Sequence, residues 1–159
     1  MAVTISKLME NGRAYFCRWH SQEDLFDSLA EDLLAEGYVK DTFKQALKER
    51  EAKYPTGIVC NKYNIALPHV DSEHVQKDAL IVAVLDEPIG FHRMDKLEEI
   101  IEVQVVFMLL IEGVSNHIQA IANLTSLWLD DGFMDELLKA TDKERIVELV
   151  KKHEKRTIA

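Results

Sequence analysis

The residue of this sequence best suited to nucleophilic chemistry is His69, which follows a proline at the end of a short apolar run. The run reads Ile65-Ala66-Leu67-Pro68-His69. Proline holds its own φ at about −65° and restricts the residue before it to extended backbone. The histidine therefore stands on a stiff segment where a strand is expected to end. Because an uncharged imidazole nitrogen is nucleophilic near pH 7, His69 is a candidate nucleophile that could meet a large partner, the alternative being a surface or core histidine with a structural role alone.

A nucleophilic imidazole must keep a proton on its second ring nitrogen. That tautomer is usually fixed by a hydrogen bond to a carboxylate or to a backbone carbonyl. Asp71 and Glu73 lie close to His69 in the sequence, and a backbone carbonyl would serve equally well. The residues alone leave these alternatives open.

A second histidine, His117, is placed where a helix is expected to begin. It follows Ser115 and precedes apolar residues at helical spacing from Ile118 to Trp128. With Ser115 as N-cap, His117 falls in the first turn, where the helix dipole lowers the pKa of a histidine and free N–H groups can bind an anion. His117 is therefore a candidate neighbour for a group that carries negative charge, the alternative being a polar residue that only caps the helix.

Strands and helices are expected to alternate along the chain. Ser21 and Asp24 form a capping box ahead of apolar positions at helical spacing, and Gly37 suits the left-handed residue that follows such a helix. Four segments have the composition of strands, at residues 14–19, 65–67, 79–85 and 103–110. This alternation predicts an α/β fold, a single domain with a central β-sheet flanked by helices on both faces.

Two further helices are indicated by local signals. One should begin at Asp41 and stop before Pro55 and Gly57, and the last should open with the capping box of Thr141 and Glu144. The basic residues of segment 151–156 then lie near the carboxyl end of that helix. There they would complement the helix dipole rather than form a nucleic-acid-binding tail.

Composition limits the environment and the partners. The chain has 159 residues, of which 47% are hydrophobic and 30% charged, and no apolar run approaches the roughly 18 residues of a membrane span. Two cysteines, Cys17 and Cys60, are too few for a disulfide framework, and we expect a cytoplasmic location. The net charge of −9 disfavours nucleic acid and anionic membranes as partners.

The segments just described resemble a known family. Ile65-Ala66-Leu67-Pro68-His69 is similar to the (Ile/Val)-Ala-x-Pro-His motif of the enzyme IIA proteins of the bacterial phosphoenolpyruvate-dependent sugar phosphotransferase system. The resemblance is to the fructose/mannitol superfamily, and the continuation Asp71 to Val75 is similar to that of its galactitol-like branch. It implies one enzyme IIA type-2 domain over residues 1–159, with a mixed central sheet as in the mannitol/fructose-type enzyme IIA fold.

The resemblance also implies roles for individual residues. His69 would be the phosphoryl acceptor, and Asn116-His117-Ile118 is similar to the family's histidine beside the active site. Arg50-Glu51 is similar to an Arg-Glu pair ahead of the family's Pro-Thr-Gly turn, so Arg50 would stabilise phosphate charge, although a surface ion pair would explain it too. Thr56 and Gly57 would shape the turn.

The implied function is a phosphotransferase that carries a phosphoryl group from the protein HPr to a cysteine of enzyme IIB. It would meet the membrane-embedded transporter IIC only through IIB, and it would serve uptake of a sugar or polyol, the galactitol type included. No cofactor or metal is implied. The alternative is a regulatory domain of the same kind, whose phosphorylation on His69 controls a partner protein instead of transport.

A zinc hydrolase is a weaker alternative. It could draw its ligands from four histidines and one cysteine, namely His69, His74, His92, His117 and Cys60. No His-Glu-x-x-His motif or closely spaced cysteine pair is present, and a spacing of five residues does not stack two histidines on one helix face. Because the family's pattern places the phosphoryl group on the histidine that follows the proline, the resemblance implies that His74 is a residue at the rim of the site.

Overall fold

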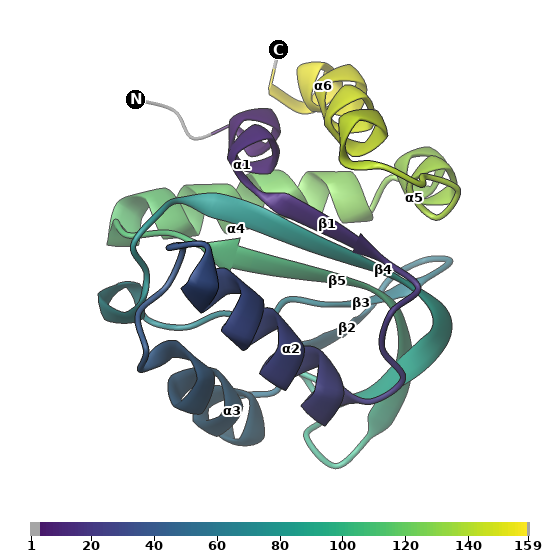
Figure 1. Cartoon of the computed structure of the whole chain (residues 1–159). Helices are drawn as coiled ribbons and strands as arrows, with labels where there is room; N and C mark the ends of the chain where they lie inside the picture. Colours follow the sequence, from purple (N-terminus) through teal and green to yellow (C-terminus); the bar gives the residue numbers. More distant parts are fainter. Residues whose placement is uncertain (1–3, 159) are drawn as a thin grey trace.

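A computed structural model of the protein describes residues 4–158, without the side chains of residues 114, 115 and 155–158. Strands are interleaved with helices along this part of the chain, as predicted, although several helices and several strands follow one another directly (Figure 1). The strands are β1 (Arg13–Phe16), β2 (Gly57–Val59), β3 (Asn64–Ala66), β4 (Ala79–His92) and β5 (Ile100–Leu110). The α-helices are α1 (Ile5–Asn11), α2 (Gln22–Ala35), α3 (Phe43–Lys53), α4 (Val114–Trp128), α5 (Asp131–Leu137) and α6 (Lys143–Ile158). A 3₁₀ turn, η1 (Ser72–His74), follows β3.

The strands form one mixed sheet in the order β1-β4-β5-β3-β2. β1 runs parallel to β4 and β3 runs parallel to β5, whereas the β4–β5 and β2–β3 pairs are antiparallel. The long β4–β5 hairpin is the spine of the sheet, and its register shifts between Val84 and Ile89. The predicted mixed sheet is confirmed.

Helices cover both faces of this sheet, as Figure 1 shows. The α2–α3 pair packs on one face and α1, α4, α5 and α6 pack on the other. Successive residues of a strand point to opposite faces, so Ile81 and Ala83 belong to the first core while Leu80 and Val82 belong to the second. The flanking of the sheet on both faces is therefore confirmed. Within the described residues, no helix is long and apolar enough to cross a membrane.

The helix signals around α2 are also confirmed. The Ser21 side chain accepts a hydrogen bond from the Asp24 amide at 3.1 Å, and the helix ends before Gly37, whose φ is +79°. A hydroxyl at the N-cap satisfies an amide that the helix leaves unpaired, and glycine adopts a positive φ without steric cost.

Three predicted helix starts are wrong by one or two residues. α3 begins after Thr42 rather than at Asp41. α6 begins after Asp142, whose carboxylate accepts the Arg145 amide at 2.8 Å, so this residue caps the helix in place of Thr141. α4 begins after Gly113; Ser115 is therefore inside the helix, and its side chain lies outside the described residues.

Several elements depart from the predicted segments. β1 stops at Phe16, because Cys17 adopts a φ of 55° that interrupts extended backbone. β4 continues seven residues past Leu85, after the register shift lets it resume pairing with β5. α1, α5 and β2 were not predicted, and each is seven residues long or shorter.

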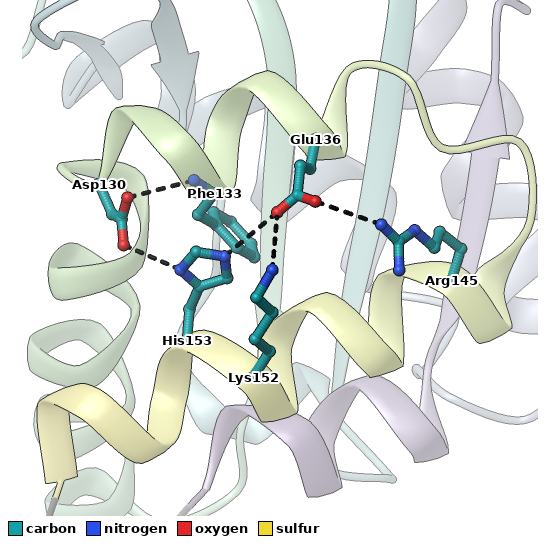
Figure 2. Close-up of polar contacts among 6 residues, drawn as sticks. All are labelled: Asp130, Phe133, Glu136, Arg145, Lys152 and His153. Atoms are coloured by element: carbon teal, nitrogen blue, oxygen red, sulfur yellow. Dashed lines mark hydrogen bonds and ion pairs between the residues drawn. The ribbon is translucent and has the colours of Figure 1, made fainter.

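The last helix is held by a buried histidine that had no motif support in the sequence. His153 on α6 is 4% exposed, and its Nδ1 lies 2.9 Å from an Asp130 carboxylate oxygen and its Nε2 3.4 Å from one of Glu136 (Figure 2). Its ring packs edge-on against Phe133, and Lys152 pairs with Glu136 at 3.6 Å. The described part of the basic segment, residues 151–154, thus contacts specific acidic residues in addition to its position near the end of the helix. The side chains of residues 155 and 156 are not among those that the structure describes.

Candidate active site

The predicted site residues come from three elements that end or begin at one edge of the sheet. β3 and β5 are parallel, so their carboxyl ends share that edge. His69 follows β3, and its backbone forms a parallel bridge with Leu109 of β5. His117 lies on α4 directly after β5, and β2 begins at the same edge because Gly57 pairs with Ala66. The last turn of α3, which carries Arg50, leads into β2.

His69 is held by its own backbone segment. Its Nδ1 lies 2.8 Å from the Leu67 carbonyl oxygen. Since a carbonyl can only accept a hydrogen bond, Nδ1 carries the proton and Nε2 keeps its lone pair. Among the alternatives that the sequence left open, the partner is therefore the carbonyl and not the carboxylate of Asp71 or Glu73. The arrangement presents Nε2 as the nucleophilic atom.

The second imidazole lies directly beside the first. The ring centroids of His69 and His117 are 5.1 Å apart, with their planes at 73°. The amide of His117 donates to the Gly113 carbonyl at 3.0 Å in the opening of α4. Burial and then the charge of Arg50 lower the pKa of His117; the direction is the predicted one, but the causes are these and not the helix dipole.

Arg50 supplies positive charge to both rings. One terminal guanidinium nitrogen lies 3.4 Å from Asp71, and the group stacks over Tyr54 with its carbon 5.6 Å from the ring centroid. The Nε of Arg50 is buried and has no hydrogen-bond partner among the described residues. Such a guanidinium has a donor left for an anionic oxygen. The structure thus brings together the three residues predicted for the site.

A buried carboxylate behind the site was not predicted. Glu51 is 6% exposed, and its two oxygens accept the amide and the hydroxyl of Thr56, each at 2.8 Å. The available signal was its spacing, because Glu51 continues the four-residue period of Phe43 and Leu47 on the buried face of α3.

Thr56 and Gly57 connect α3 to β2, and Gly57 is the first residue of that strand and does not lie in a turn. Thr56 is buried and contacts Glu51, and a Cβ on Gly57 would lie 2.7 Å from the backbone oxygen of His92. Only glycine allows β2 to approach the β4–β5 hairpin this closely. Both residues lie on the backbone that leads from α3 into β2, the strand that pairs with β3 ahead of His69.

Of the side chains that the zinc alternative would use, His69 and His117 lie together, whereas His74 and His92 are bonded to other groups. The Nδ1 of His74 lies 2.8 Å from the Thr42 hydroxyl, and that of His92 lies 2.8 Å from the Leu97 carbonyl. Burial raises the pKa of the Cys60 thiol to about 11, which suits a structural thiol. Across residues 4–158, no three or more metal-ligating side chains gather as an ion would need.

Both site imidazoles are expected to titrate below the ordinary histidine range. Burial lowers the pKa of His69, and the charges of Arg50 and His117 lower it further, against the bond to Leu67 that raises it. A lowered pKa keeps the nucleophilic, uncharged ring populated as the pH falls. NMR titration should give midpoints below the value of about 6.5 of a histidine in an unfolded peptide. A midpoint at or above that value for His69 would contradict this environment.

Comparisons with a family profile and with individual relatives point to the same protein family. The sequence profile of "Phosphoenolpyruvate-dependent sugar phosphotransferase system, EIIA 2" matches residues 16–153. The chain is similar to the galactitol-specific EIIA component of the phosphotransferase system from Escherichia coli K12, with 30% identity over 92 residues. That alignment covers 58% of this chain and 61% of the relative.

Solved structures share the fold. A putative IIA protein, PtxA, from Streptococcus mutans superposes with a TM-score of 0.74 at 23% identity, over 98% of this chain and 96% of that one. The complex of enzyme IIAMTL and phosphorylated enzyme IIBMTL from Escherichia coli contains a chain that matches with a TM-score of 0.69 at 23% identity, over 88% and 94%. At these identities the likeness concerns the fold alone.

Proposed function

Because the chain belongs to the EIIA 2 family of the phosphoenolpyruvate-dependent sugar phosphotransferase system, we propose that it is a phosphocarrier whose acceptor is the Nε2 of His69. The observation that carries this proposal is the hydrogen bond from Nδ1 to the Leu67 carbonyl, which leaves Nε2 unprotonated beside His117 and Arg50. We assign residues 1–159 to one enzyme IIA type-2 domain.

The proposed step is an in-line phosphoryl transfer from the phosphohistidine of HPr. The lone pair of His69 Nε2 forms the new N–P bond while the N–P bond of the donor breaks, and the proton on Nδ1 stays in place. The transition state of such a transfer is loose and spreads negative charge over the phosphoryl oxygens. Arg50 would donate to those oxygens and His117 would stabilise them, so the protein contributes positioning and charge rather than covalent chemistry.

The second half of the cycle would deliver the group to the cysteine of an enzyme IIB. Enzyme IIA and phosphorylated IIB form a solved complex in the mannitol system, and two large exposed side chains here belong to residues near the site in sequence. Tyr54 beside Arg50 and Ile118 beside His117 are 56% and 68% exposed. They would form the rim on which HPr and IIB dock in turn. The galactitol-specific relative favours a polyol as the transported substrate.

The test is intact-mass analysis of the wild-type protein after incubation with phosphoenolpyruvate, enzyme I and HPr. One acid-labile phosphoryl group should be gained, and it should be lost again when a cognate IIB is added. Omission of HPr is the control, because enzyme I alone should transfer nothing. Absence of any gain with all components present would refute the carrier function.

The regulatory alternative predicts a different second step. A protein that gains the phosphoryl group but is not discharged by the IIB of its own system would not serve transport. Pull-downs with the phosphorylated and unphosphorylated forms should then capture a partner that binds one form only.

A further inference from the structure

Glu51 stands next to Arg50 on α3, but its side chain is turned into the protein. It is one of few charged residues with a buried side chain, at 6% exposure. Within the described residues, both hydrogen bonds of its carboxylate come from Thr56. The Thr56 amide donates to one oxygen and the Thr56 hydroxyl to the other, each over 2.8 Å. A carboxylate removed from water needs such donors to stay charged.

A chain of hydrogen bonds continues from Thr56 to the acceptor ring. The Thr56 carbonyl accepts the Leu67 amide at 3.2 Å, and the Leu67 carbonyl accepts Nδ1 of His69 at 2.8 Å. Thr56 and Leu67 each take part in two successive hydrogen bonds, so the path is continuous from the Glu51 carboxylate on α3 to the imidazole.

The backbone along this path has little freedom to adjust. Pro55 has no N–H of its own, and the residue after it, Thr56, is 2% exposed and has both donors committed to Glu51. Pro68 restricts Leu67 to extended conformations, and Leu67 is also buried. The Leu67 amide bond to Thr56 therefore sets how the next carbonyl is aimed at His69.

We propose that Glu51 is a positioning residue for His69, which acts through Thr56 and Leu67 to hold the imidazole in the tautomer with its proton on Nδ1. The consequence for phosphoryl transfer rests on the proposed function, whereas the consequence for the tautomer does not. Without the carboxylate, two buried donors of Thr56 lose their acceptor, and the turn that aims the Leu67 carbonyl would rearrange.

The electrostatics of Glu51 agree with this role. Burial raises its pKa to about 7, against the two hydrogen bonds from Thr56 and the charges of His92 and Arg50, which favour the carboxylate. Burial of a carboxylate costs folding free energy, which its hydrogen bonds to Thr56 only partly offset. Such a residue therefore calls for a reason other than stability. A glutamate that served only the helix surface could remain solvated, as Glu49 is on the same helix.

The experiment compares paired variants at both ends of the Glu51–Thr56 contact. Glu51→Ala removes the acceptor, and Glu51→Gln restores an oxygen that can accept the Thr56 amide. Thr56→Val removes only the hydroxyl with nearly the same shape, and Thr56→Ser restores it. Glu49→Ala is the control, because it deletes an exposed carboxylate on α3 whose hydrogen bond is to Gln45 alone.

The first readout is the tautomer of His69, from the ¹⁵N shifts of its imidazole in the unphosphorylated proteins. The proton should reside on Nδ1 in the wild type and in Glu49→Ala, and it should be distributed over both nitrogens in Glu51→Ala and Thr56→Val. The second readout is the transfer rate at saturating phospho-HPr, which should fall at least about tenfold in Glu51→Ala with little change in KM. Glu51→Gln and Thr56→Ser should recover most of both properties.

A wild-type tautomer and rate in folded Glu51→Ala would overturn the proposal. If that variant does not fold, Thr56→Val decides the question by the same two readouts, and an unchanged tautomer and rate would overturn the proposal there too. A wild type that accepts no phosphoryl group would refute the carrier function and leave the tautomer experiment valid.

Discussion

His69→Ala is expected to abolish phosphorylation by the phosphoenolpyruvate, enzyme I and HPr cascade. The variant loses the ring whose Nδ1 is bonded to the Leu67 carbonyl and whose Nε2 is thereby left unprotonated, and the neighbouring ring of His117 has a supporting role and not that of acceptor in the proposed mechanism. The bound phosphoryl group is measured as an increase in intact mass, at times when the wild-type increase is still linear. The variant should show no increase in mass. His69 is only half-buried, so the fold should survive, as circular dichroism can check.

His74→Ala is the matched control for this loss. It removes a second imidazole five residues along the chain, whose Nδ1 is engaged by Thr42 at the start of α3. This variant should be phosphorylated to the same final extent as the wild type. Full phosphorylation of His69→Ala, or loss of phosphorylation in His74→Ala alone, would move the acceptor to another residue.

Arg50→Ala is expected to slow phosphoryl transfer by about 100-fold, the scale on which one charge-stabilising donor acts in a transition state. The guanidinium carries a buried Nε without a partner among the described residues, and its charge lowers the pKa of both His69 and His117. Its removal should therefore also raise both imidazole pKa values, and the pH at which the rate declines should rise with them. Rapid-quench kinetics across pH 5.5 to about 8 would measure both effects.

Two companion variants separate the functions of Arg50. Arg50→Lys keeps the charge and loses the planar set of donors, so it should restore the pKa values more fully than the rate. Lys53→Ala removes a neighbouring charge, which also lies 5.6 Å from the Tyr54 ring centroid, and should leave both properties unchanged. A wild-type rate in Arg50→Ala would show that Arg50 serves only its ion pair with Asp71.

The features that could be predicted from sequence are those that a short segment determines. Ser21 and Gly37 act on amides and dihedral angles within their own turns, so the bounds of α2 followed from residue types. The start of α6 did not, because Thr141 and Asp142 are adjacent and both can cap a helix. Which one does so depends on packing around the helix.

The site shows the same division. The Pro68-His69 pair and the position of His117 near a helix start could be read from spacing, although the two rings lie 48 residues apart in sequence and meet only because β3 and β5 are parallel neighbours. The spacing of Glu51 from Phe43 and Leu47 indicates the buried face of α3, but its contact with Thr56 could not be predicted, because it depends on how the chain returns past the end of that helix. Contacts between elements, unlike caps, have no local signature.

The bond between His69 Nδ1 and the Leu67 carbonyl has a stereochemical consequence. It leaves Nε2 as the ring nitrogen with an available lone pair, so in the proposed cycle the phosphoryl group is received on and released from that one nitrogen. Each in-line transfer inverts the configuration at phosphorus, and one passage through this protein comprises two such transfers. An isotopically chiral phosphoryl group would therefore leave for IIB with the handedness that it had on HPr.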